Sequence, residues 1–178
     1  MFMERKLAPA PWPSDGTSLA GYASLWGVTD QGNDLVERGA YAASLKRLKA
    51  ANETVKMLWQ HDPAQPIGVW DEVAEDDRGL WVRGRILTDV ARGREAAALL
   101  QAGAIDGLSI GYRTVRAAKD REGRRRLLEI DLWEVSLVTF PMLREARAEA
   151  KGDAPASDLR LLHDLSAAAR EARARLRT

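Results

Sequence analysis

The chain has 178 residues, of which 46% are hydrophobic and 30% charged, a composition typical of one soluble globular domain. The 27 Lys and Arg residues nearly balance the 26 Asp and Glu residues, and this balance argues against a specific nucleic-acid partner. The chain has no cysteine, which excludes disulfides, Cys-ligated zinc and a cysteine nucleophile. It has only two histidines, His61 and His163, so we expect neither a metal site nor another cofactor.

No apolar run approaches the roughly 20 residues that span a bilayer, and the first residues lack the apolar core of a signal peptide. We therefore expect no membrane association and a cytoplasmic protein. Three regions follow from composition: an irregular arm over residues 1–18 with one edge strand at Glu4–Leu7, a main domain over 19–150, and a linker with a helical tail over 151–178.

The main domain alternates strand-like and helix-like patterns. Apolar residues at spacings of three and four predict helices over Gly39–Ala51 and Asp89–Ala102. We expect turns at Thr29–Asp34 and around Glu75–Gly79, with the latter joining a hairpin, and a mobile basic loop at Ala117–Arg126. Strands are predicted at Leu19–Trp26, Val55–His61, Ile67–Ala74, Leu80–Leu87, Leu108–Arg116 and Leu127–Phe140. These elements indicate an α+β domain with a mostly antiparallel sheet or barrel.

Two residues are unusual for their places in these strands. Glu134 falls in the even-numbered apolar row of Leu127–Phe140, where a carboxylate is costly unless it is paired or the face is partly wet. Pairing with an arginine would account for Glu134 at this place, and so would a catalytic role. His61 extends the face of Val55, Met57 and Trp59, so it is either a satisfied core histidine or a general base.

Ser109 lies between Gly107 and Gly111 in a segment that matches the G-x-S-x-G text of α/β-hydrolases. That fold requires a helix after the serine and a histidine late in the chain, but strand-like residues follow Ser109. An α/β-hydrolase acting on small esters is therefore disfavoured. The glycines leave room beside the hydroxyl, and close packing in a barrel is the alternative to a nucleophile.

Together, Ser109, His61 and Glu134 supply a nucleophile, a base and an orienting group, each expected on the inward face of its strand. Five segments in order also resemble the prohead proteases of HK97-type tailed phages, over about residues 19–146. They are Gly21–Gly27; Asp34–Val36 with Gly39–Tyr41; Val55–Asp62 with Pro66–Gly68; Gly107–Tyr112; and Asp131–Val138 with Pro141 and Met142.

The resemblance implies a β-barrel surrounded by helices, similar to the herpesvirus assembly protease, and a serine endopeptidase with Ser109 as nucleophile and His61 as base. Herpes-type enzymes use a second histidine as third member; this chain offers Glu134 instead. The implied substrate is the scaffolding segment of the major capsid protein, cut inside the immature prohead in the host cytoplasm, together with the protease itself. Portal, shell and further copies of the chain are the other implied partners. A phage, a prophage and a gene-transfer agent all remain open as sources.

The alternative from another class is a non-catalytic capsid-assembly module with the same fold. For the tail we weigh a solvated terminal helix against a docking segment that self-cleavage removes within Lys151–Ser157, where the linker is rich in small and polar residues.

Overall fold

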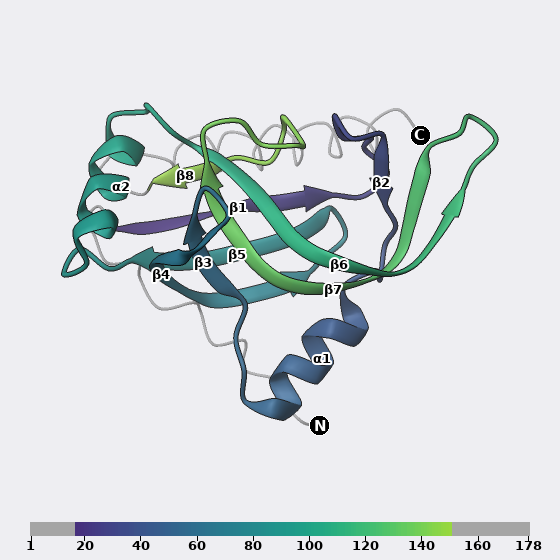
Figure 1. The fold of residues 1–178 in the computed structure, drawn as a ribbon, viewed down its shortest axis with the longest axis horizontal. Helices are drawn as coiled ribbons and strands as arrows, with labels where there is room; N and C mark the ends of the chain where they lie inside the picture. Colours follow the sequence, from purple (N-terminus) through teal and green to yellow (C-terminus); the bar gives the residue numbers. More distant parts are fainter. Residues whose placement is uncertain (1–16, 151–178) are drawn as a thin grey trace, which may run out of the picture.

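The computed structural model describes residues 17–150, which form one curled sheet with two helices. Figure 1 shows the sheet as the body of the molecule, with α1 and α2 at separate places on it. The helices are α1 (Ala42–Ala51) and α2 (Ala91–Gln101). The strands are β1 (Ser18–Leu25), β2 (Asp34–Val36), β3 (Lys56–Trp59), β4 (Asp62–Glu75), β5 (Gly79–Ile86), β6 (Gly107–Lys119), β7 (Arg125–Val138) and β8 (Ala148–Ala150).

The sheet is mixed but mostly antiparallel. Its strand order is β2-β7-β3-β4-β5-β1-β8, with β6 also paired to β7. Only β2 and β3 run parallel to a neighbour, and that neighbour is β7 in both cases. The sheet curls so that its two ends approach: the Leu108 N–H donates to the Ala146 carbonyl and the Ala148 N–H to the Asp106 carbonyl. The predicted α+β class and mostly antiparallel, barrel-like sheet are confirmed.

The core lies inside the curl of the sheet. Many of its fully buried members come from β1, β5, β6 and β7, among them Leu19, Leu80, Leu108, Leu127 and Leu137. The helices cover different parts of the sheet: α1 packs on β7 and β4, and α2 packs on β4 and β5. Because apolar burial is the main favourable term in folding, this continuous core fixes the curl and with it the positions of β6 and β7.

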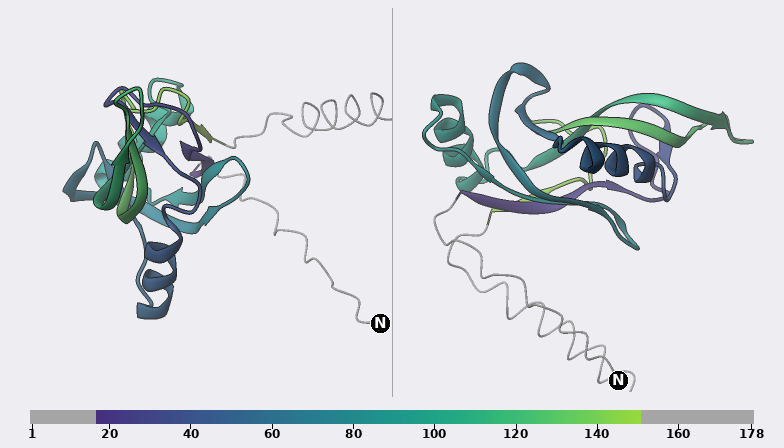
Figure 2. Two further views of the ribbon diagram at one scale, coloured as in Figure 1. Left: turned by 90° about the vertical axis from the view of Figure 1, so that its right-hand side faces the viewer. Right: turned by 90° about the horizontal axis from the view of Figure 1, so that it is seen from below.

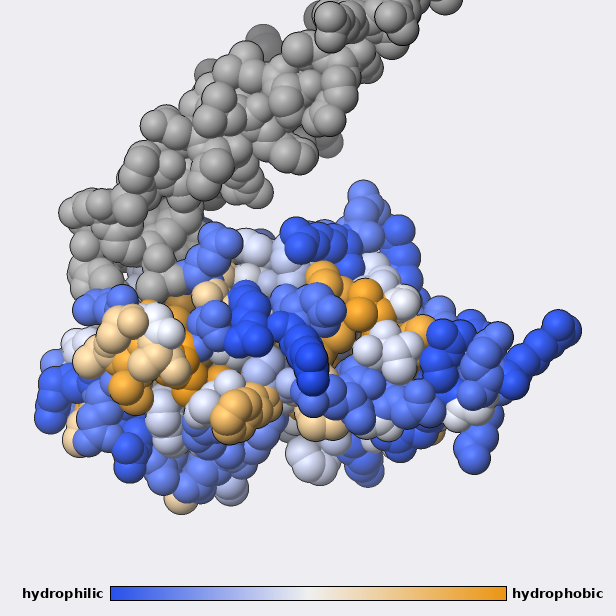
Figure 3. Space-filling view, turned by 90° about the horizontal axis from the view of Figure 1, so that it is seen from above, coloured by the Kyte–Doolittle hydropathy of each residue, from blue (hydrophilic) through white to orange (hydrophobic). Residues whose placement is uncertain are grey.

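Several predicted boundaries are wrong. The two short strands β2 and β8 are missing from the sequence-based assignment, because three residues carry too little periodicity to be recognised. Half of the predicted loop Ala117–Arg126 is strand: β6 and β7 remain paired out to Lys119 and Arg125, and a turn over 120–124 joins them. The ends of β6 and β7 project from the body there (Figures 1 and 2), so both faces of this hairpin are exposed to solvent. Its polar side chains fit this exposure (Figure 3).

The hairpin of β3 and β4 also differs from expectation. Asp62 and Pro63 do not terminate a strand but begin β4, so this strand starts five residues before the predicted Ile67. The pairing of β3 with β4 is irregular on both sides of Leu58, and such irregularities accommodate proline in a sheet. Residues 1–16 of the expected arm, with the edge strand Glu4–Leu7, and the tail helix lie outside the described residues, and Ser18, the last residue of the expected arm, already belongs to β1.

Candidate active site

The site is built on the paired strands β6 and β7. Ser109 lies directly opposite Ser136, and Gly111 lies directly opposite Glu134. Residues opposite each other in an antiparallel pair share a face, with Cβ atoms about 5 Å apart. Ser109, Ser136 and Glu134 therefore lie side by side on one face, although Ser136 and Glu134 are separated from Ser109 by a hairpin.

A β-bulge at Trp133 determines which face this is. Gly111 pairs with Glu134, but the next residue, Tyr112, pairs with Leu132, so Trp133 is an extra residue in β7. A bulge interrupts the alternation of side chains. Before Trp133 the even-numbered residues Ile130 and Leu132 enter the core, and after it the odd-numbered Val135 and Leu137 do so.

The expectation that Ser109, His61 and Glu134 occupy inward faces is therefore wrong. Uninterrupted alternation would place Glu134 in the core row of Leu132, but the bulge rotates it to the opposite face. Glu134 and Ser109 are nevertheless buried, at 8% and 5% exposure. They lie on the face of β6 and β7 that is turned away from the main core.

His61 reaches this face from a tight turn and not from a strand. β3 ends at Trp59, and both Gln60 and His61 have left-handed backbones, with φ of 52° and 61°. Such conformations are unfavourable for residues other than glycine. Because β3 runs parallel to β7 with Trp59 opposite Leu137, the turn places His61 beside the end of β7.

The structure brings His61 and Glu134 into direct contact. Nδ1 of His61 lies 2.6 Å from Oε1 of Glu134. The Oγ of Ser136 donates to Oε2 of the same carboxylate at 2.6 Å, and the backbone N–H of His61 donates to this Oγ at 3.1 Å. The imidazole is 42% exposed and the carboxylate 10%, so the far edge of the ring can meet a molecule from outside.

The hydroxyl of Ser109 makes no hydrogen bond to another described residue. The pairing of Ser109 with Ser136 nevertheless puts it next to the contact between His61 and Glu134. In unliganded sites a nucleophile and its base often approach closely only when substrate binds. Ser109, His61 and Glu134 thus lie in one region, and the side-chain types match those of a serine nucleophile with a base and an orienting group.

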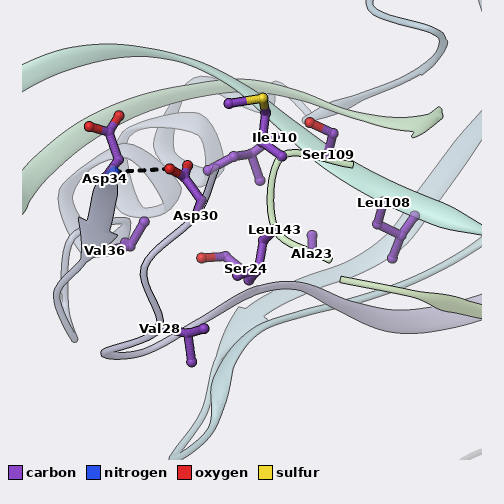
Figure 4. Close-up of a pocket in the computed structure, with 11 residues that line it drawn as sticks. Ala23, Ser24, Val28, Asp30, Asp34, Val36, Leu108, Ser109, Ile110 and Leu143 are labelled. Carbon is purple, nitrogen blue, oxygen red and sulfur yellow. Dashed lines mark hydrogen bonds between the residues drawn. The ribbon is translucent and has the colours of Figure 1, made fainter. Parts of the chain in front are cut away.

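A small pocket of about 30 Å³ is lined by Ser109 but not by His61 or Glu134. Leu108, Val28 and Leu143 line it together with Ser109. Figure 4 shows Leu108 and Ser109 on different sides of β6, as expected for successive residues of a strand.

Sequence reasoning missed two groups of polar residues. Ser136 was not predicted, because a single serine in a strand carries no distinctive pattern. Its spacing of two from Glu134, which places both on one face, was the only available signal. Asp131 was expected at a solvated edge, but it is 8% exposed. Its carboxylate pairs with Arg47 and Arg113. Desolvation raises the pKa of Asp131, but hydrogen bonds from Trp133 and Arg47 and the charges of Arg47 and Arg113 together hold it below its ordinary value.

Within residues 17–150, no three His, Asp or Glu side chains gather in a way that could hold a metal ion. No helix in this range is long and apolar enough to cross a membrane.

Comparisons with known proteins agree with this fold and show the family of the chain. Residues 7–157 match the family described as Caudovirus prohead serine protease. The chain is 34% identical over 134 residues to the prohead protease of Enterobacteria phage HK97, covering 71% of this chain and 56% of the relative. The protein belongs to the prohead serine protease family, and the chain spans a little over half the length of this relative.

Some solved structures are similar in fold to this chain. The bacteriophage T4 capsid assembly protease matches with a TM-score of 0.56 and 19% identity, over 68% of this chain and 80% of that one. A KSHV protease in complex with a hexapeptide phosphonate inhibitor matches with a TM-score of 0.47 and 13% identity, over 84% and 76%. The T4 match confirms the fold.

Proposed function

We propose that this protein is a serine endopeptidase that cleaves the scaffolding segment of the major capsid protein, and itself, during phage prohead maturation. The observation that carries the proposal is the contact of Glu134 with Nδ1 of His61 next to Ser109. Membership of the prohead serine protease family supports the reaction class, and the capsid protein is the substrate such a protease implies.

The chemistry assigns each residue one role. With Nδ1 donating to Glu134, Nε2 of His61 carries a lone pair and accepts the hydroxyl proton of Ser109 as its oxygen attacks the peptide carbonyl carbon. The C–N bond then breaks, and His61 returns the proton to the leaving amine. Water attacks the resulting ester by the same route. Glu134 holds the imidazole in the required tautomer and stabilises its charged form, and backbone N–H groups stabilise the oxyanion.

The substrate backbone would bind in extended form, since proteases read main-chain hydrogen bonds together with side-chain pockets. The protein would act inside the immature prohead in the host cytoplasm. It would meet the shell and portal there, and it would do so as a homo-oligomer.

Co-expression with the neighbouring capsid gene tests this function. Mass spectrometry should detect a shortened capsid protein with the wild type and only the full-length form with Ser109→Ala. This variant removes one oxygen from a small side chain, so its free energy of unfolding should change by less than about 1 kcal/mol. Capsid cleavage by folded Ser109→Ala would exclude this nucleophile. An intact capsid protein with the wild type would favour the non-catalytic assembly module.

A further inference from the structure

Ser136 holds both partners of the His61–Glu134 contact with one hydroxyl group. It is completely buried, at 0% exposure. Its Oγ donates to Oε2 of Glu134 and accepts the backbone N–H of His61. A hydroxyl has one proton and two lone pairs, so these two bonds commit its proton to the carboxylate and one lone pair to the turn that carries the base.

The turn requires such anchoring because its backbone is strained. Two successive residues, Gln60 and His61, are left-handed, and each such residue costs roughly 1–2 kcal/mol unless its surroundings hold it. Gln60 donates its N–H to the Leu137 carbonyl of β7 at 3.0 Å, and its side-chain amide donates to Thr139, just after β7, at 2.7 Å. His61 itself is bound to β7 through Ser136 alone among its backbone contacts.

The same hydroxyl fixes the rotation of the carboxylate. Oε1 of Glu134 faces Nδ1 of His61, and Oε2 faces Ser136. Without the Ser136 hydroxyl, Oε2 loses its donor in a buried place, which favours rotation toward another partner. Rotation moves Oε1 away from Nδ1, and the imidazole is then free to adopt the other tautomer, in which Nε2 carries the proton and cannot accept one from Ser109.

We propose that Ser136 is a positioning residue that locks the acid and the base into one arrangement through Oε2 of Glu134 and the main chain of His61. The proposal rests on the proposed function for its catalytic consequence. Ser136 need not contact the substrate, because it acts only through Glu134 and His61.

The test compares Ser136→Thr with Ser136→Val. These variants have nearly the same shape, and only threonine keeps the hydroxyl, while Ser136→Ala gives the smallest change. Ser18→Ala, at another buried serine on β1, is the control for general loss of packing. The rate at which a fluorophosphonate labels Ser109, measured by intact mass, reports nucleophile activation without requiring a peptide substrate.

We expect Ser136→Val and Ser136→Ala to label about 100-fold more slowly than wild type, the loss typical of a small misplacement of reacting groups. Ser136→Thr should stay within a few-fold of wild type, and Ser18→Ala should be unchanged. Equal labelling rates for the Thr and Val variants would overturn the proposal. Label that survives Ser109→Ala and disappears in Ser136→Ala would overturn it too, because Ser136 would then be the nucleophile.

A second measurement separates this proposal from the proposed function. Imidazole ¹⁵N–¹H spectra report the tautomer of each histidine, and the chain has only two, so His61→Ala assigns the His61 signals. We expect the Nδ1–H tautomer in wild type and Ser136→Thr and a mixture in Ser136→Val. Unchanged spectra in Ser136→Val would refute the positioning role even if the protein proves inactive. If the wild type neither labels nor cleaves, but the tautomer still differs between wild type and Ser136→Val, only the proposed function would be rejected.

Discussion

The carboxylate of Glu134 occupies the space that a side chain on Gly111 would fill. A Cβ atom placed on Gly111 would overlap Oε1 of Glu134, the oxygen that faces His61. Gly111 lies within β6 and is not among the glycines with positive φ. It is therefore required for space and not for backbone freedom, and it makes the Glu134 position possible.

Gly111→Ala should displace Glu134 and reduce peptidase activity by at least about 100-fold, at a stability cost of about 1–3 kcal/mol from overpacking. The cost should be relieved when Glu134→Ala is present, because the overlapping atoms are then gone. Urea unfolding of the two single variants and the double variant measures the coupling. Strictly additive stability losses would show that the two residues do not compete for this space.

Substitutions of His61 should separate chemistry from backbone strain. Both His61→Ala and His61→Gly should abolish peptidase activity as completely as Ser109→Ala, because the members of such a site act as a unit. At a left-handed position glycine carries no steric penalty, so His61→Gly should be about 1 kcal/mol more stable than His61→Ala. Thermal or urea unfolding decides this, and a more stable alanine variant would contradict a left-handed His61.

Glu134→Gln tests whether the carboxylate serves the reaction or only the fold. Glu134 accepts two donors, but an amide oxygen can satisfy only one, and the NH₂ group then faces Nδ1 of His61 or Oγ of Ser136. Donation to Nδ1 selects the wrong tautomer. Turnover per folded molecule should fall by roughly 10²–10⁴. If folded Glu134→Gln turns over at the wild-type rate, the orienting role belongs to another residue or to none.

An ion pair at the start of β2 should make stability depend on pH. Asp34 is buried, and Nε of Arg125 donates to it at 2.7 Å. Hydrogen bonding by Arg125, helped by Tyr112, keeps the pKa of Asp34 below its ordinary value despite desolvation. A lowered pKa contributes stability that is complete above the unfolded-state value near 4 and is lost as the pH falls through the folded-state value.

Asp34→Asn should therefore be less stable than wild type at pH 7, and the difference should shrink as the pH falls below about 4. Urea unfolding between pH 7 and pH 2.5 gives the two curves. A difference that stays constant over this whole range would mean that Asp34 contributes through its shape and neutral hydrogen bonds alone.

Truncation tests the boundary of the main domain. A chain that ends after Ala150 keeps β8 paired with β1, so it should fold and retain its chemistry but enter proheads poorly. A chain that ends after Glu145 loses β8 and the carbonyl of Ala146 that accepts from Leu108, and it should be clearly destabilised. Circular dichroism and peptide cleavage measure the folding and the activity of both truncated chains.

Self-cleavage near Lys151–Ser157 is tested by comparing the intact mass of the active enzyme with that of Ser109→Ala. Active enzyme that stays full-length through capsid maturation would contradict the self-cleavage.

Sequence alone singled out the residues of the candidate site through local chemistry. A carboxylate in an apolar strand is conspicuous because burial penalises charge, and this singled out Glu134. The flanking glycines marked Ser109, since missing side chains leave space beside a hydroxyl. His61 was singled out for a reason that the structure contradicts, because the strand through Trp59 was expected to continue to His61 and instead ends at Trp59.

Tertiary structure decided what depends on pairing between distant residues. The bulge at Trp133 is defined only by the register of β7 against β6, and it sets the face of Glu134. The parallel pairing of β3 with β7 brings together His61 and Glu134, which are 73 residues apart. Neither register nor parallel neighbours leave a local trace in a sequence, because they are fixed by the burial of the whole sheet. For the same reason, only the tertiary structure reveals that Ser136 contacts both the turn of His61 and the carboxylate of Glu134.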